Sequence, residues 1–255
     1  FELPGLAHGG NIPGLVPYGR QVGNLLFSGG NTGRAPVTGK LGSTLREQAE
    51  FAFHNTAALV ESAGFSLRDV AHLYLWLQDM NDLPTVDEVF RKTFEDPTDR
   101  PVYQPVIAEP MSSDVLLQVE ATAARGSGRA LTHVGVGAAA DQGQKAPPIG
   151  KTIDNRLFSR GILGQDPRTG RMATNPDAQA KVALGNMSVL LTSSGFSLDD
   201  VGHLFVWCKS QQNSELILER LKEVYPLEDD MPATHFIVTN LPEDIELELE
   251  IAAVR

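Results

Sequence analysis

The chain has very little cysteine. Its 255 residues include only Cys208, so no disulfide bond can form within the chain. A lone cysteine is typical of proteins in a reducing compartment. The first residues, Phe1 to Pro4, also lack the basic and then apolar layout of a signal peptide. We therefore expect a cytoplasmic protein.

Basic charge and long apolar runs are also scarce. Lysine and arginine total 21 against 32 aspartates and glutamates, which gives a formal net charge of -11. Nucleic-acid binding needs clustered basic side chains, so we expect no nucleic-acid partner. No apolar run reaches the length of about 18 residues that crosses a bilayer, so we expect no membrane partner. The six histidines have no metal-ligand spacing, and we expect no metal.

An internal repeat is the strongest feature that the sequence does have. Residues 64–76 return 131 positions later as residues 195–207, and nine of these thirteen positions are identical. A chain of this length is large enough for two domains of about 125 residues. We expect a first domain over 1–125 with an N-terminal arm, a linker rich in Gly, Ala and Pro over 126–149, and a second domain over 150–255.

Both repeats show the same order of predicted elements. In the first, the patterns predict strands at 23–28, 70–77, 103–108 and 115–124, and helices at 44–63 and 84–94. In the second, they predict strands at 156–159, 201–208, 235–239 and 246–254, and helices at 177–193 and 214–224. Thr44 and Glu47 have capping-box spacing at the first helix start, and Gly64 is a candidate left-handed cap at its end. This order predicts the α+β class, with helices on one side of a mixed sheet.

The predicted strand at 70–77 alternates clearly. Ala71, Leu73, Leu75 and Leu77 form an aliphatic face that we expect to pack on helices, and Val70, His72, Tyr74 and Trp76 form the other. The second set is more polar than a dry core usually is. We expect this face to border a second interface or a cavity, with the histidines and tryptophans of both repeats as interior structural groups.

Several motifs recur in a specific order. The first repeat contains Pro17-Tyr18, the stretches 22–29 and 63–70, Asp79-Met80-Asn81-Asp82-Leu83, and the ending 118–123. The second contains Ser159, Gly161, the turn 166–170, the block 195–201, Pro232-Ala233, Leu241-Pro242 and 248–250. In combination these motifs resemble the YjgF/UK114 family, also called RidA, over about 16–125 and 150–255. The resemblance implies two tandem chorismate-mutase-like units.

The resemblance also implies an assembly and an activity. In the family, three units close their sheets into a central barrel, and ligand sites lie in clefts between neighbouring units. Two units per chain do not divide into three, so we expect a homo-oligomer, with a homotrimer of six units favoured. Family members with known chemistry hydrolyse enamines and imines without a cofactor.

Site residues follow from the same resemblance. A glutamate on the last strand holds the water, and it corresponds to Glu120 and Glu250, which are the expected catalytic residues. The family also has an arginine that grips the substrate carboxylate. That position corresponds to Tyr103 and Thr234 here, and neither can replace a two-pronged guanidinium. Arg160 and Arg100 are candidate replacements, although the simpler interpretation is a ligand without a carboxylate there.

We therefore expect a hydrolytic deaminase of a small nitrogen-containing metabolite, with the first repeat as the better-preserved half. The alternatives are a non-catalytic ligand-binding protein and a hydrolase of a cyclic amide or C–C bond on the same fold. The expected substrate-binding residues are Tyr18, Gly29, Gly30, Tyr103, Arg160, Gly161, Thr234 and His235.

Overall fold

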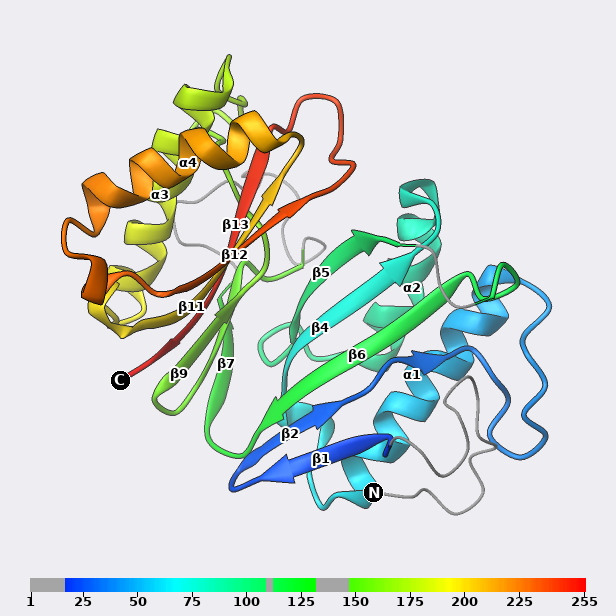
Figure 1. Cartoon of the computed structure of the whole chain (residues 1–255). Helices are drawn as coiled ribbons and strands as arrows, with labels where there is room; N and C mark the ends of the chain where they lie inside the picture. The colour runs from blue at the N-terminus through cyan, green and yellow to red at the C-terminus, as the bar shows by residue number, and fades with distance from the viewer. Residues whose placement is uncertain (1–16, 109–111, 132–146) are drawn as a thin grey trace. The chain divides into compact units, whose positions relative to one another are not determined.

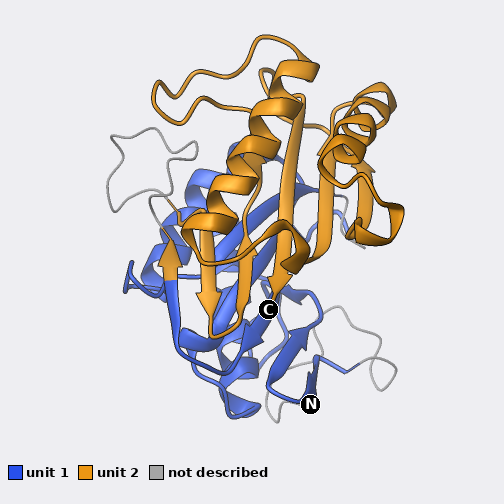
Figure 2. Cartoon of the chain, turned by 90° about the vertical axis from the view of Figure 1, so that its left-hand side faces the viewer, with its two compact units in different colours: residues 1–129 blue, residues 130–255 orange. Residues whose placement is uncertain are grey.

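The computed structural model describes residues 17–108, 112–131 and 147–255. The chain forms two compact units, residues 1–129 and 130–255, which Figure 2 shows in different colours. In each unit, two long helices pack on one face of a mixed sheet (Figure 1). This confirms the predicted fold class. Most of the predicted N-terminal arm and residues 132–146 of the predicted linker lie outside the described residues.

The first unit contains a sheet with the strand order β1-β2-β6-β4-β5, in which β3 also pairs with β6. Only β4 and β5 run parallel among these pairs. The elements are β1 (Gly19–Val22), β2 (Leu25–Ser28), β3 (Asn31–Thr32), α1 (Leu45–Ser62), β4 (Val70–Leu77), α2 (Leu83–Thr93), β5 (Val102–Ile107) and β6 (Leu117–Ala124), with short 3-10 helices at Leu67–Asp69 and Met80–Asp82.

The second unit repeats this plan in the order β12-β11-β13-β9-β8-β7, with β10 paired to β13. Its elements are β7 (Gly128–Leu131), β8 (Gly150–Ile153), β9 (Arg156–Ser159), β10 (Ile162–Leu163), α3 (Pro176–Ser193), β11 (Val201–Cys208), α4 (Gln211–Val224), β12 (Ala233–Val238) and β13 (Leu247–Val254), with 3-10 helices at Leu198–Asp200 and Glu228–Asp230. Residues 128–131 had been predicted as linker, yet they form strand β7.

Helix α1 begins and ends as the sequence predicts. The Thr44 hydroxyl accepts a hydrogen bond from the Glu47 amide at 3.2 Å. The Glu47 carboxylate, however, accepts from the Ser43 amide at 2.6 Å and does not close the box on Thr44. At the other end Gly64 has φ 74°, and the Phe65 amide donates to the Val60 carbonyl at 3.0 Å. This left-handed cap stops the helix and turns the chain toward β4.

One residue of β4 lies on a different face from the one predicted. The pairing of β4 with β6 shifts between Val70 and His72, which is a β-bulge. The bulge moves the Val70 side chain to the helix side, where it is fully buried beside Leu73 and Leu75. Strict alternation along the strand cannot anticipate an extra residue of this kind.

Buried amide side chains fasten the first helix of each unit to the surrounding loops. The Gln48 amide donates to the Asp114 carbonyl at 2.9 Å and accepts from the Leu116 amide at 2.9 Å. Gln179 forms the corresponding bonds to Asp244 and Glu246. In both units a side chain of α1 or α3 thereby fixes the start of the last strand, which carries the predicted catalytic glutamate.

Among the described residues, no helix is long and apolar enough to cross a membrane. The hydrophobic core of each unit lies between its helices and the aliphatic face of its sheet.

Replacing Gly64 by alanine should lower the free energy of unfolding of its unit by about 1–2 kcal/mol, because a Cβ atom strains a left-handed backbone. The added Cβ would also lie 3.1 Å from an Arg125 nitrogen. Chemical denaturation measures the change. Gly202→Ala is the matched control, since its Cβ would meet only a carbonyl oxygen at 4.0 Å. Equal destabilisation by both changes would contradict the explanation.

Candidate active site

The predicted catalytic glutamate of the first unit lies on the sheet face opposite the helices, which we call the helix-free face. In the antiparallel pairing of β4 and β6, Tyr74 is opposite Glu120 and Trp76 is opposite Gln118. Trp76 and Glu120 are therefore diagonal neighbours, a spacing that an aromatic side chain can bridge. The Trp76 indole Nε1–H donates a hydrogen bond to Glu120 Oε2 at 3.3 Å.

The second unit repeats this arrangement. Phe205 is opposite Glu250 in the pairing of β11 and β13, and Trp207 is diagonal to it. The Trp207 Nε1–H donates to Glu250 Oε2 at 3.1 Å. Glu250 is buried, with only 5% of its surface exposed, whereas Glu120 is half-buried. A carboxylate that is withdrawn from water needs such a donor, because an unpaired buried charge is costly.

Burial raises the pKa of Glu120 above its ordinary value. The indole of Trp76 and the nearby His72 oppose this shift, since each favours the ionised carboxylate. A carboxyl group whose pKa is moved toward neutrality can exchange protons with a reacting molecule at physiological pH. Oε1 of Glu120 makes no hydrogen bond with the residues that the structure describes.

A glycine-containing loop lies beside Glu120. β2 pairs with β6 up to Phe27 and β3 resumes the pairing at Asn31, so the predicted site residues Gly29 and Gly30 lie opposite Glu120 and its neighbour. A Cβ atom on Gly30 would come within 2.9 Å of the Gln118 side chain. The absence of a side chain there therefore permits the close approach of this loop to β6.

Tyr18 is held next to this loop. Its carbonyl accepts a hydrogen bond from the Gly29 amide at 2.7 Å, and the residue is buried. In the second unit the corresponding bond runs from the Arg160 amide to the Ile149 carbonyl at 3.1 Å. Ile149 is therefore the counterpart of Tyr18, so the second unit has no tyrosine at this position.

Arg160 and Gly161 lie beside Glu250, as the glycines do beside Glu120. β9 pairs with β13 up to Phe158 and β10 resumes at Ile162, so the intervening residues face the glutamate's position on β13. Arg160 is half-buried. Within the described parts of the chain, its guanidinium makes no hydrogen bond or ion pair. A second-unit ligand with a carboxylate would find an available cation there.

Two predicted site residues, Tyr103 and Thr234, lie on the helix side of their edge strands. The Tyr103 ring packs in the core against Phe90, and its hydroxyl donates to Asp87 Oδ1 at 2.9 Å. Thr234 pairs with the core residue Leu204, and its hydroxyl donates to a backbone carbonyl. Neither side chain lies on the helix-free face of its own unit with the glutamate.

His235 does share the helix-free face with Glu250. Phe205 is opposite both residues in its two strand pairings, so it lies between them. The His235 ring is 4.8 Å from the Phe205 ring and 4.8 Å from the His203 ring, measured between centroids. Burial lowers the pKa of His203, and the neighbouring His235 lowers it further. The second-unit site is consequently richer in imidazole than the first, where Gln104 occupies the position of His235.

Arg100 and Cys208 both have structural surroundings that argue against a role in the site. Arg100 is buried, and its guanidinium donates to the Phe94 and Glu95 carbonyls, so it holds the end of α2 rather than replacing the missing arginine. Cys208 is buried, and burial raises the pKa of its thiol to about 12. A thiol with such a pKa is not a nucleophile at neutral pH. The described residues contain no group of three or more metal-ligating side chains.

Comparison with known proteins places this geometry in a family. The family described as Endoribonuclease L-PSP matches the chain twice, over residues 12–125 and 148–255. The chain belongs to this family. The two matches correspond to the two units, so the chain carries the YjgF/RidA fold in tandem.

Individual relatives are single units. The chain is similar to the putative reactive intermediate deaminase TdcF of Escherichia coli, with 31% identity over 44% of this chain and 91% of the relative. It is similar to the 2-iminobutanoate/2-iminopropanoate deaminase of E. coli, with 29% identity over 45% and 93%. A crystal structure of E. coli TdcF with bound serine is 30% identical, with a TM-score of 0.43, and covers 46% of this chain and 93% of that one.

The role of the tryptophans was missed at the sequence level, where Trp76 and Trp207 were interpreted as interior packing. A signal was present, because each tryptophan recurs at the same place in its repeat, as does each glutamate. The register that makes them diagonal neighbours, however, depends on how β4 pairs with β6 and β11 with β13, which the sequence pattern does not show.

The raised pKa of Glu120 predicts a pH dependence of stability. A carboxyl group with a higher pKa in the folded state stabilises the fold below its unfolded-state pKa, and this contribution is lost as pH rises through the folded-state value. Glu120→Gln should therefore increase the midpoint of thermal unfolding at pH 7 and have little effect near pH 3. Differential scanning calorimetry tests this. An increase of the same size at both pH values would show that ionisation is not the cause.

Proposed function

We propose that this chain is a cofactor-independent hydrolase that deaminates enamines or imines, with Glu120 as the primary catalytic residue. The observation that carries the proposal is the tryptophan-held glutamate on the helix-free face, which both units retain. Relatives at about 30% identity are named as deaminases of imines and reactive intermediates. Glu120 is favoured over Glu250 because it is less buried and has one carboxylate oxygen without a bond among the described residues.

In this mechanism the glutamate moves protons and water forms the new bond. The water oxygen attacks the iminium carbon while Glu120 Oε1 takes one water proton, which gives a carbinolamine. The protonated carboxyl group then gives that proton to the nitrogen. The C–N bond breaks as the hydroxyl group loses its proton to the carboxylate, which passes this proton to the departing ammonia. Ammonium and a carbonyl compound are released, and Glu120 is again ionised. No oxidant or reductant is needed, and the raised pKa of Glu120 suits both transfers.

Trp76 acts as a positioning residue in this proposal. Its Nε1–H binds Oε2 and thereby directs Oε1 toward the water. The bond also favours the ionised carboxylate, which is the form that accepts the first proton.

The substrate class differs between the two units in this proposal. In the first unit Tyr103 stands at the position of the family's arginine, and Gly29 and Gly30 lie beside Glu120, so we propose a substrate without a carboxylate there. Beside Glu250 the available guanidinium of Arg160 suits an anionic ligand. The duplication would then give one chain two sites of different charge preference.

We also propose that the chain assembles into a homotrimer. The edge strand β12 exposes Phe236 and Val238, at 38% and 57% of their surfaces. Exposed apolar edge strands are normally covered in the native assembly.

Replacement of both glutamates by glutamine should lower kcat for ammonia release by about 100-fold or more, because a general acid–base typically contributes at least that factor. The substrates would be imines generated in situ, one set with a carboxylate and one set neutral. Glu228→Gln in an exposed 3-10 helix is the matched control and should keep full activity.

Single variants test which of the two substrate sets each proposed site turns over. Glu120→Gln should abolish turnover of the neutral set, whereas Arg160→Gln should affect only the carboxylated set. Ligand affinity without turnover in the wild-type chain would instead indicate a binding protein. Turnover that survives in the double variant would contradict the proposed catalytic role.

Light scattering tests the assembly. A mass of three times the chain mass of 27.5 kDa is expected at micromolar concentration. Phe236→Asp should shift the protein toward smaller species, and Val37→Asp, in a loop where Val37 is 89% exposed, should not. A clean wild-type monomer would contradict the trimer.

A further inference from the structure

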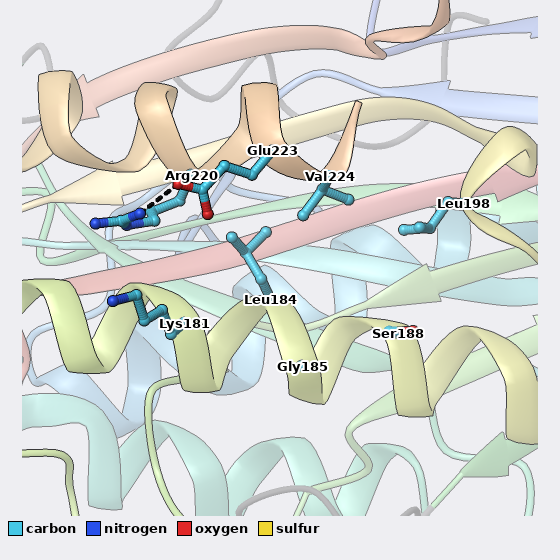
Figure 3. Close-up of a pocket in the computed structure, with 8 residues that line it drawn as sticks. All are labelled: Lys181, Leu184, Gly185, Ser188, Leu198, Arg220, Glu223 and Val224. Carbon is cyan, nitrogen blue, oxygen red and sulfur yellow. Dashed lines mark hydrogen bonds and ion pairs between the residues drawn. The ribbon is translucent and has the colours of Figure 1, made fainter. Parts of the chain in front are cut away.

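The second unit has a pocket on its helix side, away from the glutamate. The pocket has a volume of about 390 Å³ and lies between α3 and α4 (Figure 3). Glu250 is on the opposite face of the sheet, so this pocket is not part of the site described above. The pocket is lined by Lys181, Leu184, Gly185, Ser188, Leu198, Arg220, Glu223 and Val224.

The first unit shows what fills the equivalent space. Phe53 and His54 stand where the second unit has Leu184 and Gly185, 131 positions later. The Phe53 ring packs between α1 and α2, with its centroid 6.2 Å from that of Phe90. In the second unit a leucine replaces this phenyl ring. Apart from the neighbouring residues and backbone of its own helix, no atom lies within 4 Å of the position that a Cβ on Gly185 would take. The groove has therefore lost an aromatic ring, and the exposed His54 of the first unit is replaced by a glycine that carries no side chain.

The charges around the pocket balance one another. Asp177 accepts from Lys181 Nζ at 2.7 Å and from Arg220 Nε at 2.7 Å, and Arg220 also pairs with Glu223. Two cations are thus matched by two carboxylates. A charged ligand would have to displace one of these partners, whereas an uncharged ligand would not.

Hydrogen-bond donors nevertheless remain at the pocket. An ammonium group has three N–H bonds, and Lys181 uses one for Asp177. The Ser188 hydroxyl makes no hydrogen bond as a donor within the residues that the structure describes. Leu184, Leu198 and Val224 form the apolar wall, as Figure 3 shows. The lining thus combines an apolar surface with a few donors, which is typical of small-molecule sites.

We propose that this pocket binds an uncharged ring compound that carries one hydroxyl or carbonyl oxygen, a molecule of the phenol type. The ring lies over Gly185, between Leu184 and Val224, where it restores the aromatic packing that the first unit supplies from its own chain. The oxygen accepts a hydrogen bond from Lys181. The site is independent of the proposed deaminase activity.

Binding of 4-fluorophenol to the full chain, followed by fluorine NMR, tests the proposal. A dissociation constant of about 1 mM is expected for so small a ligand. Gly185→Leu should weaken binding at least tenfold, because leucine fills the open space. His54→Leu, the same change at the matched position of the first unit, should leave the affinity unchanged.

A second pocket variant and a charged analogue of the ligand test the proposal independently. Leu184→Phe, which installs the first unit's own residue, should also abolish binding and should raise the thermal midpoint. Charged 4-fluorobenzoate should bind at least tenfold more weakly than 4-fluorophenol. Equal affinity of the wild type and both pocket variants, or tighter binding of the benzoate, would overturn the proposal. Ammonia release should be unchanged in both variants, which separates this site from the one at Glu120.

Discussion

In each unit the rest of the site depends on one antiparallel register. It is the pairing of β4 with β6 in the first unit and of β11 with β13 in the second. It places Trp76 diagonal to Glu120 and Trp207 diagonal to Glu250, so an indole N–H reaches each partly or fully buried carboxylate. The buried amide of Gln48 fixes where the last strand begins. The same helix-side contacts that stabilise the core therefore also hold the carboxylate on the opposite face.

The duplication preserves this framework and changes what surrounds it. Beside the glutamate, the first unit has a glycine at Gly29 where the second has Arg160, and on the edge strand it has Gln104 where the second has His235. On the helix side, Leu184 of the second unit stands where the first unit has the phenyl ring of Phe53, and a pocket lies beside this leucine. Framework positions are repeated because both sheets need the same packing, whereas the positions around the proposed sites differ between the two units.

Much of the fold could be predicted from the sequence. The internal repeat, the alternation in β4 and the caps at Thr44 and Gly64 are local signals, and they give the helices and most strands to within a few residues. The short strands β1, β3, β8 and β10 were missed because two to four residues carry little periodicity, and β1 lies in the segment that was interpreted as an arm. Strand β7 was missed because a Gly-containing segment was assigned to the linker.

Less of the candidate site than of the fold could be predicted from the sequence. Glu120 and Glu250 were identified only through family resemblance, and their tryptophan partners were not, because a diagonal contact depends on register. Tyr103 was assigned to the site from its position in a motif, yet its side chain packs in its own unit's core. Sequence position gives the place of a residue on a strand. The pairing register, together with any bulge, decides which face of the sheet its side chain occupies.

The most direct test of this account is the pH–rate profile of ammonia release by wild type and by Trp76→Phe. The indole bond favours the ionised form of Glu120, so its removal should raise the apparent pKa of the ascending limb and lower kcat at neutral pH. Trp207→Phe should leave the profile for neutral substrates unchanged. A profile that does not move in Trp76→Phe would show that the tryptophan-held carboxylate is not the group that performs the chemistry.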